Sequence, residues 1–118
     1  MPVVFNFEGL EGREAVKVTG HEHYDVFSVK RDEEGRSVEE RYIEVKTRMT
    51  RDLGVSLSER ESEVAREKGD RYWLYIVYGA GSGSPVLLAV RNPLARLRFK
   101  RRVEIEKREK YYFSVGEV

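Results

Sequence analysis

Hydrophobic and polar positions alternate along two segments in the first half of the chain, residues 24–30 and 39–47. A period of two is typical of strands that bury one face. Residues 31–36, which separate the two segments, are charged and contain Gly35, a combination that favours a turn. The pattern therefore predicts a β-hairpin with a longer loop.

A helix is predicted over residues 58–68. Ser58 is followed three residues later by Glu61, the spacing of a capping box, in which each side chain bonds the other residue's main-chain N–H. Gly69 suits the position just after a last helical turn.

Other segments are rich in β-branched and aromatic residues and predict strands: residues 3–7, 71–79, 85–90, 102–106 and 111–115. Residues 71–79 are apolar enough to be buried on both faces, and the last two segments are predicted to form a terminal hairpin or edge strands. The polar, glycine-containing stretch 8–23 predicts mostly loop. One clear helix among strands predicts a single α/β domain over residues 1–118, with a mixed β-sheet and few helices.

Composition narrows the class of protein. Charged residues make up 36% of the chain, Gln is absent, and Asn occurs only at Asn6 and Asn92, a composition typical of thermophiles. The absence of cysteine excludes disulfides, thiolate metal sites and a catalytic thiol. No segment approaches the ~20 apolar residues of a membrane helix. We therefore expect a cytoplasmic protein without a membrane partner.

Positive charge is concentrated near the C-terminus. Nine Lys or Arg stand against three Glu between residues 91 and 110, although the whole chain carries only +1. This segment favours either a surface for a polyanion such as nucleic acid, or a solvated charged edge.

The candidate chemistry lies in the predicted hairpin. Glu44 and Lys46 point to the same face of their strand, and Asp25 joins them if paired residue numbers in the hairpin have an odd sum. Two close carboxylates favour a hard cation such as Mg²⁺ between them, and a neighbouring lysine can act on the attacking water or stabilise a phosphodiester in its transition state. If the paired residue numbers had an even sum, Glu44 and Lys46 would form only a surface ion pair, which is worth about 0–1 kcal/mol.

Beyond single motifs, the chain carries a longer series of motifs in a fixed order. Tyr24-Asp25-Val26 is followed by Arg41-Tyr42-Ile43-Glu44-Val45-Lys46, then by residues 56–61 and 69–78, and by Asn92-Pro93. This series resembles the PD-(D/E)XK nuclease superfamily, and more narrowly the NO VEIN C-terminal-like domain found at the end of large Swi/Snf-type helicases and restriction-linked proteins. The core motifs would span about residues 22–93, and basic strands would occupy residues 94–118.

The resemblance implies a restriction-endonuclease-like core and a metal-dependent endonuclease that hydrolyses DNA, in repair or restriction. Asp25 and Glu44 would bind Mg²⁺ (or Mn²⁺) together with the main-chain carbonyl of Val45, and Lys46 would be the catalytic lysine. For contacts with DNA phosphates, the candidates are Arg48, Lys100, Arg101 and Arg102. The alternative is an inactive nuclease-fold module for DNA binding or assembly, as a homodimer or with a helicase.

Several points stay open. The superfamily begins its core with a helix that often supplies another acid; the candidates here are Glu8, Glu11 and Glu14, but nearby glycines argue against a helix. The first helix could therefore be missing, come from a partner chain, or have been lost in a non-cleaving relative. Glu61 matches a recurrent helix acid, although its capping role is the favoured interpretation.

Two further motifs are weak. His21 and His23 have no third metal ligand at recognisable spacing. The glycines at 79, 81 and 83 lack the lysine of a P-loop, so a turn is expected there.

Overall fold

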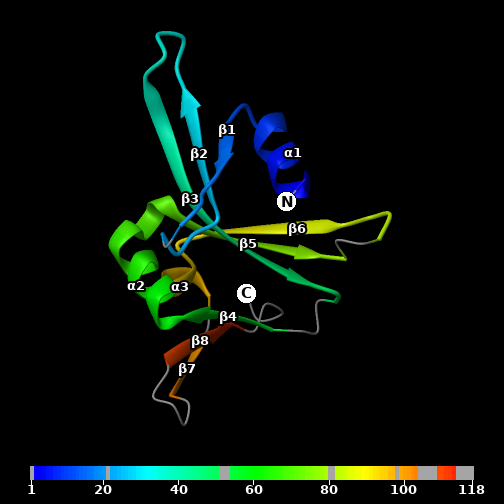
Figure 1. Cartoon of the computed structure of the whole chain (residues 1–118), viewed down its shortest axis with the longest axis vertical. Coiled ribbons are helices and arrows are strands. Elements are labelled where there is room, and N and C mark those ends of the chain that lie inside the picture. The colour runs from blue at the N-terminus through cyan, green and yellow to red at the C-terminus, as the bar shows by residue number, and fades with distance from the viewer. Residues whose placement is uncertain are drawn as a thin grey trace.

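The computed structural model describes residues 2–20, 22–50, 54–79, 82–97, 99–103 and 109–113, with side chains described as far as residue 97. At its centre lies a five-stranded mixed sheet, and a smaller three-stranded sheet packs nearby (Figure 1). The helices are α1 (Pro2–Leu10), α2 (Glu59–Lys68) and α3 (Pro93–Arg96), with a 3₁₀ turn η1 (Gly69–Arg71). The strands are β1 (Glu14–Lys17), β2 (Val26–Arg31), β3 (Ser37–Arg48), β4 (Val55–Ser58), β5 (Tyr72–Tyr78), β6 (Val86–Arg91), β7 (Phe99–Val103) and β8 (Glu109–Phe113).

The central sheet has the strand order β1-β2-β3-β5-β6. Only β3 and β5 are parallel, because the chain crosses over between them through β4 and α2; the other neighbours are antiparallel. β3 pairs with β2 along its first half and with β5 from Tyr42 onward, so its first residues extend beyond β5 in the hairpin arm of Figure 1. The α/β class and the mixed sheet with few helices are as predicted.

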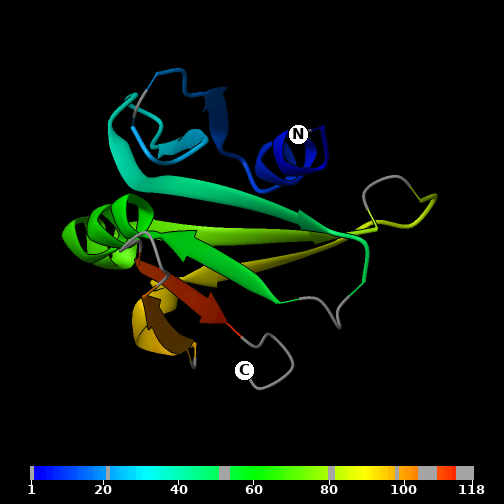
Figure 2. The ribbon, with the colours of Figure 1, turned by 60° about the horizontal axis from the view of Figure 1, so that its bottom comes forward.

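Each face of the central sheet is covered by a different set of elements (Figure 2). One face carries Ile43, Tyr75 and Val77 and packs against α1. The opposite face carries Leu74 and Ile76 and packs against α2, β4 and α3. Since β5 buries side chains on both faces, its apolar run reflects a central strand, as expected from the sequence.

The strand prediction for residues 3–7 was wrong, because these residues belong to α1. Val4 and Glu8, one helical turn apart, are both buried against the sheet, and Phe5 and Phe7 are partly buried. Packing of this face outweighs the strand preference of the β-branched and aromatic residues. The chain therefore supplies its own first helix, so two of the alternatives considered for that helix, its absence and its supply by a partner chain, are wrong.

Several other elements follow the prediction closely. The capping box of α2 is present, with the Glu61 N–H donating to Ser58 Oγ at 3.1 Å and the Ser58 N–H donating to Glu61 Oε1 at 2.9 Å. The predicted terminal hairpin exists as β7 and β8, with shifted bounds. The pattern missed the short elements β1, β4 and α3. The longest described helix has only 10 residues, so none of the described helices could cross a membrane.

Candidate active site

The register of the β2–β3 hairpin brings the two predicted acids together. Val26 lies opposite Ile43, so paired residue numbers have the odd sum that the hypothesis required. The Asp25 N–H donates to the Ile43 carbonyl at 2.8 Å, so Asp25 and Val26 both lie against Ile43 at the end of the ladder, and the Asp25 carboxylate is close enough to interact with Glu44. Glu44 and Lys46 share the face that packs against α2.

Asp25 is fixed at the point where the β2 ladder ends. Its Oδ2 accepts a hydrogen bond from the Val45 N–H at 2.8 Å, so a side-chain oxygen takes the place of a main-chain acceptor. Because the N–H and C=O of one strand residue point to the same edge, the Val45 carbonyl faces the edge where Asp25 lies. Two carboxylates and a main-chain carbonyl thus converge at this edge.

Glu44 is a buried carboxyl group, with only 5% of the residue exposed. Burial raises the pKa of Glu44 to about 9, and the negative charges of Glu61 and Asp25 add to the effect, while Lys46 opposes it. At neutral pH the group therefore holds a proton unless a further positive charge is present. A strongly shifted acid of this kind is a mark of functional sites.

Lys46 lies between two acids. Its Nζ is 3.4 Å from Glu44 Oε2, and it donates to both oxygens of Glu61 at 3.1 and 3.3 Å. Burial alone would lower the pKa of Lys46, but the charges and hydrogen bonds of Glu44 and Glu61 outweigh it, so the pKa is raised. Lys46 is therefore a positioned cation here and not a base that could take a proton from water.

Glu61 serves two purposes at once. It completes the capping box of α2, as the favoured interpretation held, and the same carboxylate contacts Lys46. The sequence contained only one signal for this second contact, namely the match to a recurrent helix acid. The contact ties the start of α2 to the middle of β3.

Tyr72 is a site neighbour that the sequence reasoning placed only in the core. It is fully buried, and in the described part of the chain its hydroxyl has no hydrogen-bond partner. Burial raises the pKa of Tyr72, and the charges of Glu44, Glu61 and Asp25 add to this rise. The tyrosine therefore stays neutral beside the acids.

The residues predicted to contact phosphates lie on two different sheets. Arg48 donates from Nε to the Gly54 carbonyl at 2.9 Å and from Nη1 to the Thr47 carbonyl at 2.6 Å, so its guanidinium group holds the loop after β3. Lys100, Arg101 and Arg102 lie on β7 in the three-stranded sheet, and their side chains fall outside the described part of the structure.

Glu8, one of the three acids considered for the first helix, lies on α1 but against the other face of the sheet. Its carboxylate accepts from Arg13 Nε at 2.9 Å, from Arg13 Nη2 at 2.8 Å and from the Tyr75 hydroxyl at 2.8 Å. Tyr75 is opposite Val45, and residues next to each other along a strand face opposite sides, so Glu44 and Tyr75 lie on different faces. Glu8 is thus separated from Asp25 and Glu44 by the sheet.

Among the described residues, no group of three or more His, Asp or Glu has the arrangement of a ready-made metal site. His21 lies outside the described residues, and the third acid near Glu44 is Glu61, which is already bonded to Lys46. A cation at Asp25 and Glu44 would therefore complete its coordination with the Val45 carbonyl, water and substrate, as Mg²⁺ commonly does.

The fold belongs to a known class. The chain is similar to the solved structure of Hjc from Archaeoglobus fulgidus, a Holliday junction resolvase from an archaeal hyperthermophile, with a TM-score of 0.58 and 20% sequence identity over 92% of this chain and 77% of that one. At this identity the likeness establishes the fold, which is restriction-endonuclease-like, or PD-(D/E)XK-like. None of the curated proteins matches the chain.

Residues 1–90 match the family described as protein NO VEIN, C-terminal. Because this match covers α1, β1 to β5 and most of β6, the chain belongs to that family. The resemblance inferred from the sequence motifs is confirmed.

Proposed function

We propose that this chain is a metal-dependent nuclease domain that hydrolyses DNA phosphodiester bonds, with Asp25, Glu44 and Lys46 as its catalytic residues. The observation that carries the proposal is the hairpin register, which sets Asp25 beside Glu44, with Lys46 Nζ 3.4 Å from the same carboxylate. The restriction-endonuclease-like fold supports it.

The donor set fits Mg²⁺ or Mn²⁺. Both are hard cations that prefer carboxylate and carbonyl oxygens, which Asp25, Glu44 and Val45 offer at one strand edge. A bound cation would supply positive charge to the scissile phosphate and make a bound water more acidic. Ionised Glu44 would gain a second positive neighbour in addition to Lys46, which it shares with Glu61.

Lys46 would stabilise negative charge on the phosphate. Its pKa is raised, so it remains an ammonium group that donates hydrogen bonds, and such a fixed donor stabilises charge that develops in the transition state. Glu61 would act as a positioning residue, because it holds Lys46 Nζ at 3.1 Å while anchored to the α2 N-terminus through Ser58. Asp25 would keep β3 in place through the Val45 N–H.

The test combines metal binding with cleavage. Calorimetric titration of Mn²⁺ or Mg²⁺ should show binding to the wild type that Glu44→Gln abolishes. Plasmid, single-stranded DNA and a four-way junction should be cut by the wild type, and Lys46→Ala should lower the rate by at least about a hundredfold. Lys30→Ala, which removes an exposed lysine of β2, is the matched control and should retain full activity.

A second function is a DNA-binding or assembly module that keeps the fold without cleaving. The specific observation in its favour is the full engagement of Lys46 by Glu44 and Glu61, which leaves the lysine committed to protein partners. Wild-type protein that binds DNA but neither binds metal nor cuts any of the three substrates would establish this function and exclude the nuclease. Light scattering would then determine whether the chain is a homodimer.

A further inference from the structure

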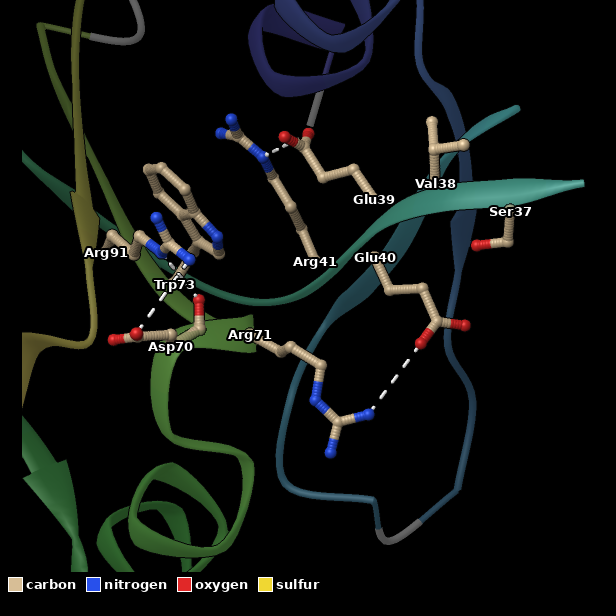
Figure 3. Close-up of a pocket in the computed structure, with 9 residues that line it drawn as sticks. All are labelled: Ser37, Val38, Glu39, Glu40, Arg41, Asp70, Arg71, Trp73 and Arg91. Atoms are coloured by element: carbon tan, nitrogen blue, oxygen red, sulfur yellow. Dashed lines mark hydrogen bonds and ion pairs between the residues drawn. The ribbon is translucent and has the colours of Figure 1, made fainter. Parts of the chain in front are cut away.

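A second feature lies outside the candidate active site: a hollow of about 510 Å³ at the base of the β2–β3 arm (Figure 3). Its walls come from the first residues of β3, from η1, from Trp73 on β5 and from Arg91 on β6. The hollow exists because β3 pairs with β5 only from Tyr42 onward, so the preceding residues of β3 have no strand on that side.

One wall of the hollow is rigid. The Arg41 guanidinium stacks over the Trp73 ring at 3.6 Å from its centroid. Arg41 also donates to Glu39 at 3.1 Å and to the Tyr75 hydroxyl at 2.8 Å, so its donors are directed to protein groups. Arg41 therefore shapes the wall and fixes Trp73 rather than binding a ligand.

The rim, in contrast, carries two half-exposed arginines with long ion pairs. Arg71 is 3.8 Å from Glu40 and Arg91 is 3.9 Å from Asp70, and the two arginine side chains are 54% and 50% exposed. Both ion pairs are longer than a hydrogen bond, and exposed pairs of this kind contribute little. Arg91 is also anchored through its Nε, which donates to the Asp70 carbonyl at 2.9 Å, so its terminal nitrogens are the ones that a ligand can engage. Figure 3 shows these side chains on either side of Trp73. The guanidinium groups are thus available to a stronger acceptor.

Arg71 connects the hollow with the face of the sheet that carries Glu44. Trp73 lies opposite Ile43 and Arg91 lies opposite Trp73, so both are on the α1 face, whereas Glu44 lies opposite Leu74 on the α2 face. The Arg71 guanidinium is 5.7 Å from the Tyr42 ring centroid and Lys68 Nζ is 4.4 Å from it, and Tyr42 shares the face of Glu44. Cations therefore follow the catalytic face from Lys46 toward the rim.

From this arrangement we infer that the hollow binds the sugar-phosphate backbone of the DNA strand outside the candidate active site, where Arg71 reaches the face that carries Glu44. Arg71 and Arg91 would exchange their long carboxylate contacts for bidentate phosphate contacts, which are among the strongest hydrogen bonds that arginine makes. The inference rests on the proposed function for its ligand. Binding here does not require cleavage, however, so the two can be tested separately.

Trp73 makes the test direct, because it is the single tryptophan of the chain and lines the hollow. In EDTA, which prevents cleavage, titration with a single-stranded oligonucleotide should change Trp73 fluorescence. The affinity from this titration should match the affinity obtained from the fluorescence anisotropy of a labelled strand. Arg71→Ala/Arg91→Ala should weaken binding about tenfold and reduce the salt slope by about 1.4, the value for two lost phosphate contacts on a single strand.

Two further variants separate lost contacts from structural damage. Arg31→Ala is the matched control: its side chain is 48% exposed and 3.8 Å from Glu14, but it does not line the hollow, so DNA affinity should not change. Glu40→Gln should increase affinity severalfold, because it frees Arg71, and a damaged fold would not bind more tightly.

Unchanged affinity and salt slope in the double variant, with normal wild-type binding, would overturn the inference and leave the nuclease proposal intact; a hollow that takes a peptide strand would give this result. Failure of the wild type to bind DNA would also overturn it. Binding that depends on Arg71 and Arg91 without any cleavage in Mg²⁺ would support the inference and count against the nuclease.

Discussion

The two faces of the central sheet each bury a glutamate, and the pKa values of these two glutamates are shifted in opposite directions. Glu8, on the α1 face, is 0% exposed and bonded to Arg13 and Tyr75; burial alone would raise its pKa, but these partners outweigh burial and hold the pKa below its ordinary value. Glu44, on the α2 face, is 5% exposed, and burial raises its pKa to about 9.

The difference lies in the neighbours. Glu8 faces an arginine whose own pKa is raised: burial would lower it, but hydrogen bonds and charge from Glu8 prevail. Glu44 faces two other acids and shares its one lysine. A buried carboxylate with matched donors supports the fold, whereas one without them is unstable unless a ligand supplies charge. Glu8 therefore stabilises the fold, whereas Glu44 lies on the face for which we propose chemistry.

The largest loss of stability should come from breaking the buried ion pair of Arg13 and Glu8. Arg13→Ala leaves the Glu8 carboxylate buried without its two hydrogen bonds, so we expect unfolding free energy to fall by about 3 kcal/mol or more in urea denaturation. Arg36→Ala, which breaks an exposed pair with Asp32, is the control and should change it by less than about 1 kcal/mol. Equal losses in both variants would remove the distinction between the faces.

On the opposite face, Glu44→Gln should stabilise the apo protein at pH 8, by up to about 5 kcal/mol for a shift of this size. The folded-state pKa of about 9 is above the ordinary value of 4.5, so the folded chain retains a proton that the unfolded chain releases. Wild-type stability should therefore decline relative to the variant as pH rises from about 4.5 to about 9. Unfolding measured across this range checks the sign, and a pH-independent difference would contradict a protonated Glu44.

A smaller effect distinguishes the tyrosines of β5. Tyr75→Phe removes the hydroxyl that accepts from Arg41 and donates to Glu8, both at 2.8 Å, and should cost about 1–2 kcal/mol. Tyr72→Phe removes a hydroxyl without a partner in the described part of the chain, and should be neutral or slightly stabilising. Thermal unfolding of the two variants gives the comparison directly. A larger loss for Tyr72→Phe would mean that this hydroxyl bonds one of the acids.

Local patterns predicted much of this fold. Alternation located the β2–β3 hairpin, the Ser58/Glu61 spacing located the start of α2, and the apolar run located β5. These features depend on residues close in sequence. The sequence showed which parity of the paired residue numbers would bring Asp25 to Glu44. The parity itself is determined only by the folded hairpin.

What escaped prediction depends on contacts between distant segments. Residues 3–7 have strand preferences, yet they form part of α1 because Val4 and Glu8 pack on the sheet. Glu8 was considered as a catalytic acid, and nothing in its local sequence shows that Tyr75, 67 residues away, would bond it. The link between Lys46 and Glu61 likewise requires α2 to fold back over β3.

The hydrogen bond from the Val45 N–H to Asp25 also has an evolutionary consequence. An asparagine at position 25 could offer its amide oxygen to the same N–H, so folding alone requires an acceptor there and not a negative charge. A lineage could therefore abandon the proposed phosphodiester chemistry through this one substitution while keeping its hairpin. Selection for the charge itself is what would maintain an aspartate at this position.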